Sequence, residues 1–166
     1  ALNDLLDEIN VDAARYYFNS RTSTSPLDFD LDLAVREDSE NPVYYVQYAH
    51  ARICSILKKL QAEGITARKP EKAELTLLSS EEETDLIAHL AAFTGTIVSA
   101  AKAYDPAKIT HYATDLATKF HRFYNAQRVM VDDEALMQAI IFLCESVRSV
   151  MKNVLSMLKI EAPESM

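Results

Sequence analysis

The chain contains few of the residues that interrupt helices. It has only two glycines and five prolines among 166 residues, and glycine is the residue on which turn-rich β structures depend most. Nearly half of the residues are apolar, and a chain of this length buries about 70% of its unfolded surface on folding. We therefore expect an all-α fold in one domain, or in one domain with a short piece of a neighbour.

Cysteines and long apolar runs are also scarce. Cys54 and Cys144 lie in separate apolar stretches, and two distant cysteines without a C-x-x-C pair are typical of reduced core thiols in a cytoplasmic protein. There is no run of eighteen apolar residues, so we expect no membrane-spanning segment and no membrane partner. The chain starts at Ala1 without a leader-like segment, and we expect it to be a piece of a longer protein.

The motifs of common catalytic and metal centres are missing. The four histidines show neither metal-ligand spacing nor the Glu-x-x-His motif of a di-iron bundle. There is no glycine-rich loop to hold a phosphate, and no cysteine or serine stands in a nucleophile motif. We therefore expect no catalytic residue, no metal and no cofactor in this chain, although the longer protein can still be an enzyme.

One stretch, residues 41–60, organises the rest of the chain. Asn41 is a favourable cap, and Pro42 suits the first helical position because no hydrogen bond is lost there. Gly64 can adopt the left-handed conformation that ends a helix. Between these signals the apolar residues recur with the period of a buried helical stripe: Val43, Val46, Ala49, Ile53, Ile56, Leu57 and Leu60.

A second line of residues runs beside this stripe. Tyr45, Tyr48 and Arg52 have the spacing i, i+3 and i+7, and Lys59 continues the line. Aromatic rings can stack on unpaired bases, and the cations can hold phosphates. A tyrosine beside a helix core is, however, more often a packing residue with its hydroxyl in water. Spacing alone leaves both interpretations open.

The charge of the chain is unevenly distributed. A net charge of −8 argues against binding nucleic acid through bulk charge. Residues 41–70 nevertheless contain five basic residues and one acidic residue, whereas residues 1–40 contain three basic and ten acidic residues. Any RNA contact should therefore be local and involve few phosphates. Because the helix dipole also favours cations near a helix end, a purely structural role for these basic residues stays open.

Periodicity and capping signals predict the remaining elements. The alternation of Leu27, Phe29 and Leu31 predicts an extended approach to a short helix. Residues 65–78 should form a loop, and residues 160–166 an extended tail. We expect helices over residues 4–9, 11–19, 31–37, 80–94, 97–104, 106–127 and 133–158, with a break at Gly95 and caps at Asn3, Asn10, Ser80 and Asp132. The short links between the four main helices predict an antiparallel bundle.

The stretch NPVYYVQYAHAR, residues 41–52, resembles the first helix of the C-terminal anticodon-binding domain of arginyl-tRNA synthetases. Four further stretches are similar to the same family and occur in the family's order. They are LLDEINVDAARYYF near the start, LDFDLDLA before the helix, KFHRFYNAQRV later and APESM at the end. The resemblance covers nearly the whole chain. It implies that residues 1–40 connect an upstream catalytic domain to a helical anticodon-binding domain of residues 41–166.

The resemblance also implies a function and a set of site residues. The chain would bind the anticodon loop of arginine tRNA and so support the ATP-dependent ligation of arginine to this tRNA by the full-length enzyme. The tail would fold back against the 41–60 helix, so that Met166 packs near Tyr48 and its carboxylate approaches Arg52 or another cation of the positive flank. The implied tRNA-binding residues are Tyr45, Tyr48, Arg52, Lys59, Tyr124 and Met166.

Several positions stay ambiguous. Gln47 and Asn125 are polar candidates with ordinary surface or capping roles as the alternative, and His121 and Arg122 face either RNA or solvent. The family commonly ends in Pro-x-Arg-Met, whereas this chain has Ser165 in place of the arginine. Val154 and Lys159 stand where the family often has glycine in the last helix.

The strongest alternative from another class is a helical protein-interaction module without catalytic activity. Such a module would expose a contiguous apolar patch rather than a basic flank that carries tyrosines. A self-standing enzyme is the third possibility, and the missing motifs argue against it.

Overall fold

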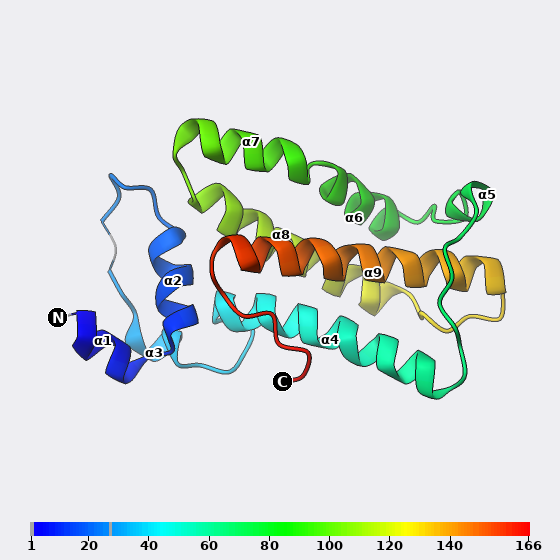
Figure 1. Ribbon diagram of the computed structural model, residues 1–166, viewed down its shortest axis with the longest axis horizontal. Helices are drawn as coiled ribbons and strands as arrows, with labels where there is room; N and C mark the ends of the chain where they lie inside the picture. The colour runs from blue at the N-terminus through cyan, green and yellow to red at the C-terminus, as the bar shows by residue number, and fades with distance from the viewer. Residues whose placement is uncertain (1, 27) are drawn as a thin grey trace.

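The computed structural model describes residues 2–26 and 28–166, and it confirms an all-α antiparallel bundle (Figure 1). Within these ranges no residue belongs to a β-strand. The helices are α1 (Leu2–Glu8), α2 (Val11–Asn19), α3 (Leu31–Ala34), α4 (Pro42–Ala62), α5 (Lys72–Leu75), α6 (Glu81–Ala91), α7 (Phe93–Ala103), α8 (Ala107–Ala126) and α9 (Glu134–Met157).

Three long helices form the centre of the bundle. α4 and α9 lie side by side and run in opposite directions, and α8 packs against both (Figure 1). α6 and α7 in turn pack against α8. Val46 of α4, Phe120 of α8 and Met151 of α9 are fully enclosed at the centre. The apolar stripe predicted for residues 41–60 is therefore the core face of α4, and the flanks of the helix remain for other contacts.

The two ends of α4 are stabilised differently. Gly64 has φ +79°, so the predicted left-handed end of the helix is confirmed. Asn41 precedes the helix, but its side chain makes no capping hydrogen bond. Instead, its amide nitrogen donates to the carbonyl oxygens of Ala34 at 3.2 Å and Arg36 at 2.8 Å. The side chain that was expected to cap α4 therefore fixes the chain that leads into it.

These two hydrogen bonds also explain why α3 is shorter than predicted. The helix ends at Ala34 and not at residue 37. Beyond it, the Asp38 carboxylate accepts hydrogen bonds from the Arg36 side chain and from the backbone nitrogen of Glu40. The chain therefore turns towards α4 instead of continuing the helix. Leu27 of the predicted alternation lies outside the described residues.

The predicted loop over residues 65–78 contains one helical turn, α5. The Glu74 carboxylate accepts a hydrogen bond from the backbone nitrogen of Glu71 at 2.6 Å and pairs with the Arg68 guanidinium at 2.6 Å. The expectation of a plain loop was wrong because side-chain capping, rather than apolar periodicity, forms this turn.

The break between α6 and α7 falls at Ala92 and not at Gly95, which lies inside α7. The two helices meet at an angle of 42°. The Tyr112 hydroxyl donates to the His89 carbonyl oxygen at 2.9 Å, and the two rings stack with centroids 4.2 Å apart. A tertiary hydrogen bond thus engages a carbonyl in the last turn of α6, so the break depends on α8 and not on the flexibility of glycine.

Two predicted caps are displaced. Asn3 lies within α1, which already begins at Leu2, and therefore does not cap it. At the start of α9 the cap is Asp133 rather than Asp132, because the Asp133 carboxylate accepts from the backbone nitrogen of Leu136. The expected caps Asn10 and Ser80 are confirmed.

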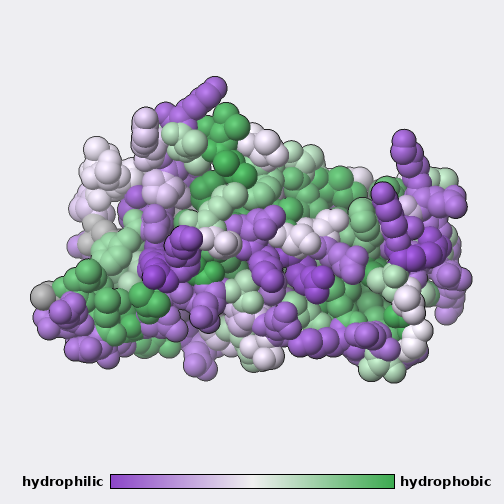
Figure 2. Space-filling view, viewed as in Figure 1, coloured by the Kyte–Doolittle hydropathy of each residue, from purple (hydrophilic) through white to green (hydrophobic). Residues whose placement is uncertain are grey.

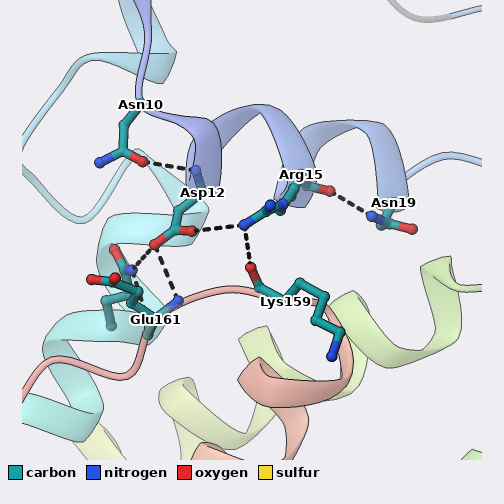
Figure 3. Close-up of polar contacts among 7 residues, drawn as sticks. Asn10, Asp12, Arg15, Asn19, Lys159 and Glu161 are labelled. Atoms are coloured by element: carbon teal, nitrogen blue, oxygen red, sulfur yellow. Dashed lines mark hydrogen bonds and ion pairs between the residues drawn. The ribbon is translucent and has the colours of Figure 1, made fainter. Parts of the chain in front are cut away.

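The C-terminal tail returns along α4, as predicted, and α2 holds it there (Figure 3). Lys159 has φ +58°, the conformation in which glycine is least strained, and it turns the chain at the end of α9. The Lys159 carbonyl accepts from Arg15 Nη1 at 2.6 Å. The buried carboxylate of Asp12 accepts from the backbone nitrogen of Glu161 and from Gln47 Nε2, both at 3.1 Å. One carboxylate therefore joins α2, α4 and the tail.

Candidate nucleic-acid interface

A groove of about 620 Å³ lies between α4, α8 and the chain that precedes α4. α4 contributes its tyrosine-bearing flank, which the 3.6-residue period places beside the core stripe and not within it. α8 contributes residues from its last two turns. The lining residues are Glu37, Ser39, Tyr44, Tyr45, Tyr48, Arg52, His121 and Asn125.

Aromatic rings form one wall of the groove. Tyr44 and Tyr48, one helical turn apart, are nearly parallel, with an interplanar angle of 6° and centroids 6.3 Å apart. The imidazole of His121 approaches Tyr45 to 5.0 Å and Tyr48 to 5.9 Å between ring centroids. Tyr48 is 37% exposed, so part of its ring remains open to a ligand. A flat, partly exposed π-surface of this kind can take a stacked base.

Arg52 supplies the positive charge of the groove. Its guanidinium carbon lies 4.4 Å from the ring centroid of Tyr124 and 5.7 Å from that of Tyr48. Among the described residues, no carboxylate lies within ion-pair distance of this guanidinium. The two rings hold Arg52 through cation–π contacts, while its N–H donors remain available to a carbonyl or phosphate oxygen.

His121 lies at the base of the aromatic wall. It is only 9% exposed, and its Nε2 atom is enclosed without a hydrogen-bond partner. Burial, with a smaller contribution from the charge of Arg52, lowers the pKa of His121 to about 4. The imidazole is therefore neutral at physiological pH, with one nitrogen that donates and one that accepts.

The structure brings only some of the predicted site residues together. Tyr45, Tyr48 and Arg52 line the groove, and Tyr124 contacts it through Arg52. Lys59 is separate: it lines a neighbouring groove of about 370 Å³ with Tyr124 and lies 3.9 Å from Glu63.

Met166 and Tyr48 line different pockets. Met166 lines a hollow of about 330 Å³ together with Tyr44 and Gln47. Tyr44 lines both this hollow and the main groove, where its ring is parallel to that of Tyr48. The expected pairing of the tail carboxylate with Arg52 is not observed, and the tail is instead paired with α4 through Lys58 and Glu164, 3.5 Å apart.

Gln47 is engaged inside the chain. Its amide nitrogen donates to Asp12 and to the Glu161 carbonyl oxygen. Asn125 is exposed and lines the groove. Arg122 is exposed and does not line the groove; it contributes, after Lys119, to the lowered pKa of Asp85 on α6.

Sequence reasoning missed Tyr44 and did not decide the role of His121. Tyr44 precedes Tyr48 by one turn, so the i, i+4 spacing was a usable signal. His121 carried no local signal, because its place between two tyrosines of α4 depends on how α8 packs. Glu37 and Ser39 reach the groove only through the turn that follows α3.

The described residues show neither a metal cluster nor a single membrane-spanning helix. Among residues 2–26 and 28–166, no three histidine, cysteine, aspartate or glutamate side chains are grouped as they would be around a metal ion. In the same part of the chain no single helix is long and apolar enough to cross a membrane, although the bent pair α6 and α7 passes this test by length and composition together.

The fold and the site together define a class: a helical-bundle domain with an open aromatic groove and an arginine whose donors are available, an arrangement that can take an unpaired base. Within that class, the chain belongs to the DALR anticodon binding domain family, whose sequence model matches residues 46–166. The match begins within α4, and the predicted boundary between residues 40 and 41 stays a prediction.

The similar proteins are arginine–tRNA ligases. The chain is 50% identical over 165 residues to that of Caldanaerobacter subterraneus, covering 99% of this chain and 29% of the relative. The ligase of Acetivibrio thermocellus is 48% identical over 166 residues, which cover 100% of this chain and 29% of that relative. The solved structure of Thermus thermophilus arginyl-tRNA synthetase aligns with a TM-score of 0.80 at 27% identity, over 93% of this chain and 26% of that one. The chain thus spans about three tenths of the length of these relatives.

Proposed function

We propose that this chain binds the anticodon loop of arginine tRNA, as the anticodon-binding part of a longer arginine–tRNA ligase that works in the cytoplasm. The ATP-dependent ligation itself belongs to a catalytic domain in the rest of that protein. The observation that carries the proposal is the groove in which ring and cation–π contacts hold Tyr48 and Arg52, while their side chains make no hydrogen bond or ion pair with the described residues. The family and the similar ligases agree with it.

The geometry suits an unpaired base better than a duplex. Single-stranded loops expose bases that can be stacked on aromatic rings and read along their edges. Tyr48 offers the stacking surface, and Arg52 offers donors for a base carbonyl or a phosphate. Because the anticodons of all arginine tRNAs share a cytosine at the middle position, a groove that accepts one cytosine serves every isoacceptor.

The exposed apolar side chains of α1 support a contact with the rest of the longer protein. Leu2 is 59% and Leu6 38% exposed, and apolar surface gathers over α1 at the left of Figure 2. We infer that this surface packs against the upstream catalytic domain. Leu2→Ser with Leu6→Ser should then loosen that packing in the full-length enzyme, with increased amide hydrogen exchange around α1 and unchanged exchange in α8.

The proposed function is tested by fluorescence anisotropy of this chain with anticodon stem-loops that carry either C or U at the middle position. The parent chain should prefer C. Tyr48→Ala should weaken binding by about 1–3 kcal/mol, the value of one base–aromatic stack. Few phosphate contacts predict a log–log salt slope of roughly −2 to −3.

Tyr104→Ala is the matched control, because Tyr104 is 94% exposed at the end of α7 and lies outside the groove. Thermal melts of each variant separate lost binding from lost folding. Equal affinity of the parent for both loops would remove the specificity, and no binding to either loop would favour the protein-interaction module instead.

A further inference from the structure

A second groove lies at the carboxyl ends of α4 and α8, next to the groove that Tyr48 and Arg52 line, which is the first groove. The second groove encloses about 370 Å³, within the range of pockets that hold small ligands. It is formed by the last two turns of α4, the end of α8 and the chain that follows α8. Its lining residues are Ile56, Lys59, Leu60, Tyr124, Gln127, Arg128, Val129 and Met130.

One contact separates the two grooves. Arg52 lines the first groove and Tyr124 lines the second, and the Arg52 guanidinium carbon lies 4.4 Å from the centroid of the Tyr124 ring. From Arg52 to Ile56, the first residue of α4 in the second groove, the helix rises by one turn, about 6 Å. An RNA strand with one base in the first groove therefore has the second groove beside its next nucleotide.

The second groove is positively charged. Lys59 and Arg128 line it, and no carboxylate among the described residues does. In the same part of the chain Arg128 forms no ion pair. Lys59 lies 3.9 Å from Glu63 in an exposed pair, a kind that contributes little energy. Both cations are therefore available to phosphate oxygens. The first groove differs, because Glu37 lines it together with Arg52.

The second groove also offers surface for a base. Val129 is buried beneath it, whereas Met130 is 40% exposed. A thioether packs well against aromatic rings, and Tyr124 adds a ring of its own. Gln127 is held by its Nε2 atom, which donates to Ser80 Oγ at 2.9 Å, so its carbonyl oxygen can accept from the edge of a base. Cations beside aromatic and apolar side chains are the usual means of holding single-stranded nucleic acid.

We propose that the second groove binds the loop nucleotide next to the base held in the first groove, with the base of that nucleotide against Met130 and Tyr124 and its phosphate on Arg128 and Lys59. This inference rests on the proposed function, since it requires a loop base in the first groove. It also gives the loop a direction across α4, because the second groove lies on one side of the first. The charges select an anionic backbone, since an apolar protein segment would cover two cations without pairing them.

The test changes one loop nucleotide at a time. Stem-loops with cytosine at the middle position carry an abasic site at either neighbour of that cytosine, or a methylphosphonate at either phosphate that joins it to a neighbour. Anisotropy with the parent chain should show a loss at one neighbour only. Removing that base should weaken binding roughly two- to tenfold, the range of one thioether–aromatic contact. Neutralising that phosphate should reduce the log–log salt slope by about 0.7, the share of one phosphate on a single strand.

Matched charge variants connect the phosphate effect to the second groove. Lys59→Gln with Arg128→Gln should weaken binding of the unmodified loop, and the methylphosphonate should then cost nothing further. Lys102→Gln with Arg122→Gln is the control, because it removes two exposed positive charges from residues that line neither groove. This control should keep the full effect of the methylphosphonate.

A matched methionine pair does the same for the base. Met130→Ala should reduce the loss caused by the abasic site. Met157→Ala changes a similarly exposed methionine at the end of α9, outside both grooves, and should leave that loss unchanged. Thermal melts of every variant separate lost binding from lost folding.

The outcomes separate this inference from the proposed function. If the parent binds no loop, both fail. If the parent prefers cytosine over uracil at the middle position but tolerates every change at both neighbours, the proposed function stands and the second groove does not bind RNA. Equal losses at both neighbours would overturn the inference too, because one groove cannot hold both nucleotides.

The protein variants give the same decision independently. If the paired charge variant and Met130→Ala bind all loops as the parent does, the inference is wrong and the second groove is left to an acidic protein segment. Should either variant fail to fold, the comparison of the modified loops on the parent still decides.

Discussion

The two flanks of α4 carry similar numbers of polar residues but use them in opposite ways. On the flank that faces the tail, His50 Nδ1 donates to the Pro163 carbonyl at 2.8 Å, and Gln47 Nε2 donates to the Glu161 carbonyl at 3.0 Å. On the flank that faces the groove, the Tyr48 ring stacks on other rings and the Arg52 guanidinium makes cation–π contacts, and neither side chain forms a hydrogen bond or ion pair with the described residues. The tail carbonyls are thus hydrogen-bonded on the first flank, although His50 Nε2 is enclosed without a partner, and the donors of Arg52 are left available on the second.

This difference shows which flank builds the fold and which one is kept for a ligand. Hydrogen bonds to the tail close the bundle and use up the donors of α4, so substitutions there should lower stability. The groove flank contributes less to stability because its polar atoms have few partners to lose. A substitution on the tail flank should therefore change the free energy of unfolding, whereas a substitution on the groove flank should change loop binding.

The largest expected effect concerns His121 in acid. The pKa of this imidazole is lowered to about 4 in the folded chain, against an unfolded value of 6.5. As the pH falls from about 6.5 to 4, the unfolded chain binds a proton that the folded chain does not, so the free energy of unfolding should fall by roughly 2–3 kcal/mol. Below the folded pKa no further loss is expected from this group. Urea unfolding at several pH values measures the slope.

His121→Phe should flatten this part of the pH profile, whereas His111→Phe should leave it unchanged. His50 on the tail flank contributes in the same direction, since burial lowers the pKa of His50 despite its bond to Pro163. A profile of His121→Phe that runs parallel to that of the parent would show that folding does not lower the pKa of His121.

The next effect concerns the tail flank. Asp12→Ala removes the acceptor shared by the Glu161 backbone nitrogen and the Gln47 amide, and the free energy of unfolding should fall by about 2 kcal/mol. Asp12→Asn keeps one side-chain oxygen and should lose less. Urea unfolding gives the stability, and stem-loop binding should remain within about twofold of the parent at a temperature where both chains are folded. An Asp12→Ala chain as stable as the parent would mean that the tail is held by other contacts.

The smallest expected effect concerns Met166, which lies where the two flanks of α4 meet. Met166 lines the hollow beside Tyr44, which stacks on Tyr48. Removing Ser165 and Met166 should weaken loop binding by about two- to fivefold, in line with the modest energy of one thioether–aromatic contact. The melting temperature should stay unchanged, because the contacts of Glu161, Pro163 and Glu164 remain.

Removal of residues 161–166 is the comparison for that deletion. It takes away the tail contacts of Gln47, His50 and Lys58 and should lower the melting temperature as well. If the two-residue deletion binds the loops as tightly as the parent, Met166 has no part in the groove.

Much of the fold follows from the sequence alone, because local periodicity and capping decide it. The seven apolar residues of the 41–60 stripe, the left-handed end at Gly64 and the caps Asn10 and Ser80 were all readable in this way. The line of Tyr45, Tyr48 and Arg52 was readable too, since helical spacing places these residues on one flank. The prediction of a plain loop at α5 was wrong because the turn depends on the capping contact between Glu71 and Glu74, and not on apolar periodicity.

The tertiary structure decided which polar residues remain free. Gln47 and Tyr48 are adjacent in sequence, but one is paired with α2 and the tail while the other faces the groove. The break at Ala92 and the place of His121 likewise depend on α8 packing against other helices. Such outcomes lie beyond local sequence because a hydrogen-bond partner from a distant segment exists only once the helices have packed, and only then is it settled which donor is satisfied and which is left for a ligand.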